Sequence, residues 1–92
     1  MMNAIEVEFF GIARQRAQKS SATIAVDGSL RLTDILSTLS ERFPDLVPDC
    51  IVRGRLTNIC SANLNGDRFL PDVEFEIHPG DRLLIMSADA GG

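Results

Sequence analysis

The side chains that most often do chemistry in proteins are scarce in this chain. It has 92 residues, with two cysteines, Cys50 and Cys60, and a single histidine, His78. There is no CxxC pair, and these three residues could contribute to a zinc site only at a spacing that matches no known pattern. His78 precedes the turn sequence Pro79-Gly80-Asp81, and no nucleophile elbow is present. We therefore expect no metal site, two buried or half-buried free thiols and a histidine in a turn.

A second candidate for chemistry is the end of the sequence, Ser87-Ala88-Asp89-Ala90-Gly91-Gly92. Glycine has no Cβ, so a glycine pair can enter a narrow channel and leave its carbonyl open to attack. Six extended residues span about 20 Å. Two interpretations are open at this point: a frayed terminus without a role, or a terminal carboxylate that is itself the reactive group. We expect one domain over residues 1–87 and a flexible tail over residues 88–92.

Composition and charge exclude several classes of protein. The net charge of −4 and the pI of about 4.7 argue against a nucleic-acid-binding protein, which would need a basic surface. No apolar run approaches the roughly 20 residues that cross a bilayer, and the first residues do not resemble a signal peptide. We expect a cytoplasmic protein without nucleic-acid or membrane partners.

One amphipathic helix is expected in the middle of the chain. Apolar residues recur at helical spacing, and they are Leu32, Ile35, Leu36, Leu39 and Phe43. Pro44 cannot continue a helix, so the pattern predicts a helix that ends close to Phe43.

Strands are predicted on both sides of this helix. Alternating or continuous apolar runs predict strands at residues 5–9, 23–26, 60–64, 73–77 and 82–86. Asn65-Gly66 predicts a tight type I′ turn, because both residues tolerate a positive φ. Residues 11–22 are polar and predict a loop, whereas residues 45–57 give no clear element beyond a turn of helix or a short strand.

These elements together predict an α+β fold. A single main helix must bury its apolar stripe against one face of one sheet. The run at residues 82–86 is apolar on both faces, which is typical of a central strand, and the first strand is a suitable neighbour. If these two strands are parallel, the arrangement is a mixed sheet of the β-grasp (ubiquitin-like) type.

Four stretches of the sequence resemble a known family. They are Val7-Glu8-Phe9-Phe10-Gly11-Ile12-Ala13-Arg14, Asn63-Leu64-Asn65-Gly66, Pro79-Gly80-Asp81-Arg82-Leu83-Leu84-Ile85 and the terminal Gly91-Gly92. Together they resemble the small ubiquitin-like sulfur carriers, such as the small subunit of molybdopterin synthase and the sulfur carrier of thiamine synthesis. The acidic Asp89 departs from the apolar or proline-containing tail of the molybdopterin branch.

The resemblance implies a function without catalytic side chains. A ubiquitin-activating-type adenylating enzyme would use ATP to adenylate the Gly92 carboxylate, and sulfur transfer would then leave a thiocarboxylate. The sulfur would pass to the large molybdopterin synthase subunit or to another acceptor, and no cofactor would be bound. Gly91 and Ala90 would contact the partner, as would an apolar patch of Phe10, Met86 and Leu84 (or Leu83).

Two other functions remain open. A ubiquitin-like protein modifier, joined to lysines through Gly92, would begin with the same adenylate. A non-catalytic β-grasp binding module with an inert tail would need no adenylate at all. The sequence does not select the acceptor, since thiamine, molybdopterin, tungstopterin and thiolated tRNA bases would all suit this tail.

Overall fold

The computed structural model describes residues 3–88 of the chain. Its helical elements are two α-helices, α1 (Gly11–Ala17) and α2 (Leu32–Arg42), and one short 3₁₀ helix, η1 (Pro44–Leu46). Its strands are β1 (Ala4–Phe9), β2 (Ser21–Ala25), β3 (Leu30–Arg31), β4 (Ile51–Val52), β5 (Arg55–Leu56), β6 (Cys60–Leu64), β7 (Arg68–Phe69), β8 (Glu76–Ile77) and β9 (Arg82–Ser87).

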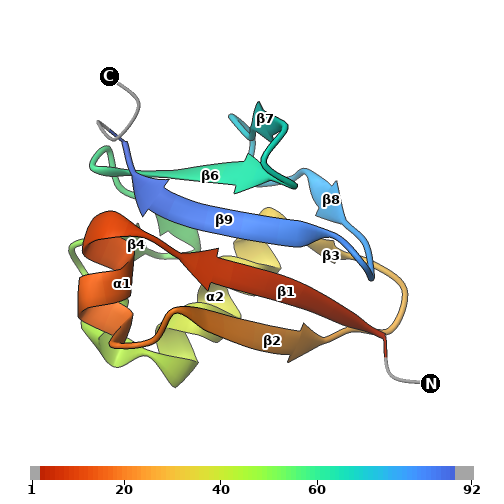
Figure 1. Ribbon diagram of the computed structural model, residues 1–92, viewed down its shortest axis with the longest axis horizontal. Helices are drawn as coiled ribbons and strands as arrows, with labels where there is room; N and C mark the ends of the chain where they lie inside the picture. Colours follow the sequence, from red (N-terminus) through yellow and green to blue (C-terminus); the bar gives the residue numbers. More distant parts are fainter. Residues whose placement is uncertain (1–2, 89–92) are drawn as a thin grey trace.

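Five strands form a mixed sheet in the order β2-β1-β9-β6-β7, so β9 is the central strand, as predicted. β1 and β9 run parallel, while β2, β6 and β7 pair antiparallel with their neighbours. The helix α2 lies across one face of this sheet, and Figure 1 views the molecule from the opposite face. The α+β class with one main helix is thereby confirmed.

The hydrophobic core lies between the sheet and α2. Ile5, Val7 and Phe9 of β1 and Leu83 and Ile85 of β9 point toward the helix and are almost completely buried. The helix contributes the predicted stripe, since Leu32, Ile35, Leu36 and Leu39 are at most 1% exposed. Phe43 extends this stripe by packing edge-to-face against Phe9, with ring centroids 5.4 Å apart. The periodicity of both elements therefore fixes which face of each is buried.

The expectation of a loop at residues 11–22 is wrong. Residues Gly11–Ala17 form α1, and β2 begins at Ser21. Only Ala13 and Ala17 of α1 are buried, one turn apart, so the helix contributes little apolar surface and leaves a weak periodic signal. Gln18 ends it in a left-handed conformation, with its N–H donating to the Arg14 carbonyl.

The strand predicted at residues 73–77 is mostly absent. Only β8, Glu76–Ile77, is paired, and its partner is the two-residue β3. A turn closed by the Phe75 N–H and the Asp72 carbonyl, 3.2 Å apart, occupies the start of the predicted strand. Alternation alone therefore overestimates strand length here, because the partner strand is short.

The turn at Asn65-Gly66 is confirmed. Both residues have positive φ, 59° and 73°, and the Asp67 N–H donates to the Leu64 carbonyl at 2.9 Å. The segment without a clear prediction contains η1 and a small β4–β5 hairpin. None of the helices in the described part of the chain is long and apolar enough to cross a membrane.

Candidate functional site

The sheet has an outer face, which is the side turned away from α2. The pairing of β1, β9 and β6 places Glu8, Leu84 and Asn63 in one row across this face. The next row holds Met86 and Ser61, which are paired in register. The sequence analysis left Leu83 and Leu84 as alternatives for the apolar patch. Leu83 belongs to the core, so Leu84 is the one that lies on the outer face.

Phe10 extends the outer face at the end of β1. Its N–H donates to the Ile85 carbonyl at 2.9 Å, which places Phe10 beside Met86 in the parallel pairing. Its side chain is 40% exposed, although the neighbouring Phe9 is buried. The structure thus brings together Phe10, Leu84 and Met86, the three body residues that the sequence proposed for partner binding.

Two further apolar residues lie on the outer face and were missed by the sequence analysis. Phe69 of β7 pairs with Asn63 and is 59% exposed. Ile59 precedes β6 on the same face, and its carbonyl accepts the Ala88 N–H at 2.8 Å. The alternation of residues 59–64 could have indicated Ile59, whereas Phe69 depends on the register of a two-residue strand. We call Phe10, Ile59, Phe69, Leu84 and Met86 together the outer apolar patch.

Charged and amide groups surround the patch. The Arg82 guanidinium lies 3.7 Å from the Glu8 carboxylate at its margin. Asn63 is only 7% exposed, and its side-chain oxygen has no hydrogen-bond partner in the described part of the chain. The patch therefore offers mainly apolar contact, and an exposed apolar surface beside a charged margin is typical of a surface that binds another protein.

The end of β9 is held to the body from two sides. The Ser87 hydroxyl accepts the Ile12 N–H at 3.0 Å, so a side chain at the end of the sheet satisfies one of the free amides of α1. On the other side lies the Ala88–Ile59 backbone hydrogen bond. Figure 1 shows β9 ending beside α1, and the last described residue, Ala88, lies next to Ile59 of the outer apolar patch.

The cysteines and the histidine are where the sequence led us to expect them. Cys50 and Cys60 are free and buried. Burial raises the pKa of both thiols, that of Cys60 to about 12. Thiols that stay protonated are poor nucleophiles and poor metal ligands. His78 lies exposed in its turn, where its carbonyl accepts the Asp81 N–H at 3.0 Å.

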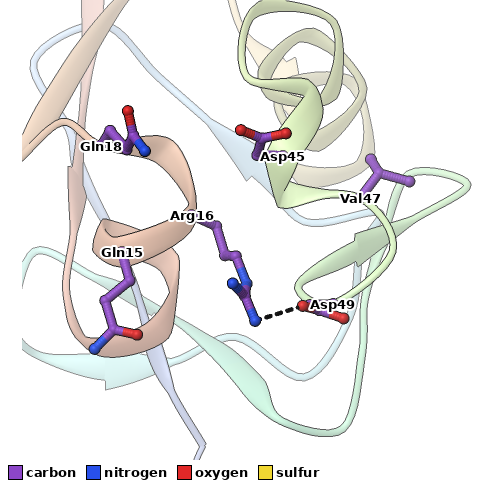
Figure 2. Close-up of a pocket in the computed structure, with 6 residues that line it drawn as sticks. All are labelled: Gln15, Arg16, Gln18, Asp45, Val47 and Asp49. Carbon is purple, nitrogen blue, oxygen red and sulfur yellow. Dashed lines mark ion pairs between the residues drawn. The ribbon is translucent and has the colours of Figure 1, made fainter.

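A polar pocket lies between α1 on one side and η1 with the segment that follows it on the other. Gln15, Arg16 and Gln18 line one side, and Asp45, Val47 and Asp49 line the other (Figure 2). The Arg16 guanidinium is already paired with the Asp49 carboxylate at 2.8 Å. The ion pair gives Arg16 a structural partner, and the pocket lacks converging buried groups.

The remaining predicted site residues, Ala90, Gly91 and Gly92, lie outside the described residues 3–88. Within that range, no group of three histidine, cysteine or acidic side chains could hold a metal ion. The arrangement that the structure does describe is an apolar surface beside the point where the chain leaves β9. Such an arrangement can dock a protein beside the end of β9.

The strand order and the main helix define the β-grasp fold, which is the fold of ubiquitin. No model of a protein family and no curated protein sequence matches this chain at a significant level. Solved structures do match it.

The small archaeal modifier SAMP1 from Haloferax volcanii superposes with a TM-score of 0.78 and 22% identity, covering 97% of this chain and 99% of SAMP1. A protein described as molybdopterin converting factor subunit 1, from Pyrococcus furiosus, has a TM-score of 0.75 and 17% identity, covering 92% of this chain and 97% of that one. A chain of the BexX/CysO complex from Amycolatopsis orientalis has a TM-score of 0.72 and 22% identity, covering 97% of this chain and all of that one. At these identities the likeness shows a common fold.

Proposed function

We propose that this chain is a ubiquitin-like sulfur carrier, which delivers sulfur as a C-terminal thiocarboxylate for molybdopterin or a related sulfur-containing product. The observation that supports the proposal is the point at which the chain leaves β9. The central strand β9 is held through Ala88 beside the outer apolar patch, and the sequence reaches Gly91-Gly92 a few residues later. The proposal takes Gly92 as the C-terminus of the mature protein.

The chemistry needs nothing from the side chains of the carrier. The Gly92 carboxylate attacks the α-phosphorus of ATP in the active site of an adenylating enzyme, which releases pyrophosphate and leaves an acyl-adenylate. A persulfide sulfur then attacks the acyl carbon and expels AMP. A second thiol attacks the sulfur–sulfur bond of the resulting acyl disulfide, which frees the thiocarboxylate and leaves an ordinary disulfide. The absence of a side chain at Gly91 and Gly92 favours this route, because the acyl carbon stays accessible.

The outer apolar patch supports the proposal as a docking surface for the adenylating enzyme and the sulfur acceptor. Ordering a chain end on a partner costs about 1 kcal/mol per residue. Contacts elsewhere must offset this cost, and buried apolar surface contributes roughly 25 cal/mol per Å². Phe10 and Phe69 are large exposed aromatic residues, which are enriched among the residues that dominate binding energy at interfaces.

Intact-mass measurement tests the proposal. The chain is incubated with the adenylating enzyme of the same genome, ATP and a persulfide donor, and the expected product has one oxygen replaced by sulfur at the C-terminus. Two controls share the folded body: a chain that lacks Gly91 and Gly92, and a chain with one alanine added after Gly92. Neither control should gain sulfur. An unchanged mass of the intact chain with a competent enzyme would contradict the proposal.

A protein modifier is the second candidate function, favoured by the likeness to SAMP1 from Haloferax volcanii. It differs from a carrier in what attacks the adenylate-derived acyl group, which would be a lysine amine of another protein. Tryptic digestion of cell extracts would then leave residues 83–92 of this chain, which follow its last arginine, on those lysines. Remnants that disappear when Gly91 and Gly92 are deleted would support the modifier, and their absence would favour the carrier.

A further inference from the structure

The side chain of Ser87 contacts a segment of the chain that is distant in the sequence. Ser87 is the last residue of β9, and its hydroxyl oxygen accepts the Ile12 N–H at 3.0 Å across 75 residues of sequence. The backbone of α1 comes close enough for this contact because residue 11 is glycine. Gly11 has a φ of 58°, and a Cβ at this position would overlap the Ser87 hydroxyl.

The same point of the chain is held from the opposite side. The Ala88 N–H donates to the Ile59 carbonyl at 2.8 Å, so α1 holds residue 87 and Ile59, just before β6, holds residue 88. Four residues follow Ala88 in the sequence. Covalent geometry limits their span to about 14 Å. The region that the C-terminal carboxylate can reach is therefore determined by the position and direction of the backbone at Ser87 and Ala88.

We infer that Ser87 is a positioning residue, whose hydrogen bond to the Ile12 amide sets the direction in which the chain leaves β9. This direction presents the C-terminal carboxylate to an adenylating enzyme docked on the outer apolar patch, so the inference rests on the proposed function. Ser87 touches no reacting atom. It acts by limiting the directions in which the backbone can leave β9. Orientation of a reacting group contributes to the rate only when the group is held in place.

Replacement of Ser87 by alanine separates positioning from docking. Ser87→Ala removes the acceptor of the Ile12 N–H but leaves Phe10, Leu84 and Met86 unchanged. Pyrophosphate release by the adenylating enzyme of the same genome is measured at varied carrier concentration with saturating ATP, in the presence of a persulfide donor and a thiol that consume each acyl-adenylate and allow turnover. We expect kcat to fall about three- to tenfold, the factor that corresponds to one net hydrogen bond, while KM for the carrier changes less than twofold.

Three further variants complete the experiment. Thr33→Ala is the matched control, because it removes another long-range hydrogen bond from a side chain, the one from Thr33 Oγ1 to the Gly54 carbonyl at 2.8 Å. Thr33→Ala should keep the wild-type kcat. Ser87→Thr retains a hydroxyl and should restore most of the rate. Gly11→Ala displaces the Ser87 hydroxyl by changing its neighbour in α1 and should reproduce the fall in kcat. This variant keeps the test informative if Ser87→Ala does not fold.

A second readout does not depend on the enzyme. The ¹⁵N heteronuclear NOE of the Ser87 and Ala88 amides should be typical of the folded body in the wild type and should fall in Ser87→Ala. If the wild type releases pyrophosphate and Ser87→Ala matches Thr33→Ala in kcat, the inference is wrong and the proposed function stands. If the wild type releases none, the proposed function fails, and the positioning role fails with it. Unchanged NOE values in Ser87→Ala would also overturn the inference.

Discussion

Substitution of Gly11 by alanine should destabilise the protein more than its backbone conformation alone explains. A Cβ at residue 11 would overlap the Ser87 hydroxyl and lie 3.2 Å from the Ser87 Cβ. The hydroxyl must then rotate away, which leaves the Ile12 N–H without its acceptor. An unsatisfied donor costs about 1–3 kcal/mol. The positive φ of 58° adds about 1 kcal/mol for a residue with a Cβ.

Gly66→Ala provides the baseline for this prediction. Gly66 also has a positive φ, 73°, but a Cβ there would meet no atom within 4 Å. Both variants lower the entropy of the unfolded chain in the same way, so this contribution cancels in the comparison. We expect Gly11→Ala to lower the free energy of unfolding by about 1–3 kcal/mol more than Gly66→Ala, measured by urea denaturation at constant slope.

A double-mutant cycle with Ser87→Ala tests the cause of this difference. Once the hydroxyl is absent, Gly11→Ala no longer displaces it, and the Ile12 N–H has already lost its acceptor. The double mutant should therefore lose less stability than the sum of the two single losses, with a coupling energy of about 1 kcal/mol or more. Equal losses for Gly11→Ala and Gly66→Ala, together with additive behaviour in the cycle, would refute the contact between Gly11 and Ser87.

Three other predictions concern the core, the thiols and the outer face. Leu39 is completely buried and Phe69 is 59% exposed, so Leu39→Ala should cost about 2–5 kcal/mol in urea denaturation and Phe69→Ala much less; similar losses would contradict the assigned core. The folded-state pKa of Cys60 is raised from 9.0 to about 12, so its contribution to stability is complete below pH 9 and is lost as the pH rises from 9 to 12. Cys60 should contribute to this fall in the free energy of unfolding by at most about 1.4 kcal/mol per pH unit, and a pH dependence unchanged in Cys60→Ala would refute this cause. Met86→Glu should raise KM for the adenylating enzyme about tenfold or more with little change in melting temperature, whereas an unchanged KM would exclude the outer apolar patch as the docking surface.

The elements that the sequence predicted well each have a clear periodic pattern of apolar residues. The helix near residues 32–43 and the strand near residues 82–86 each have an apolar face that the core buries almost completely. The central position of β9 followed from the same pattern, because Leu84 and Met86 add apolar side chains on the opposite face. The three body residues of the candidate site were predictable for this reason, since strand alternation assigns Phe10, Leu84 and Met86 to one side of the sheet.

The features that the sequence did not predict depend on contacts between distant segments. The helix α1 buries only two alanines, and one of its free amides is satisfied by Ser87, 75 residues away. Phe69 reaches the outer face through pairing with Asn63 in a strand of two residues. Such contacts leave no periodic signal, because each depends on the register of the assembled sheet and not on neighbouring residues.

Formation of the acyl-adenylate tests the central claim most directly, because the carrier and the modifier both require it. The intact chain is incubated with ATP and the adenylating enzyme of the same genome, without a sulfur donor, and its mass is measured before and after fragmentation. We expect the added mass of AMP on the fragment that contains Gly92, and none on a chain that lacks Gly91 and Gly92. A chain that stays unmodified, or AMP found on an internal residue, would contradict the account.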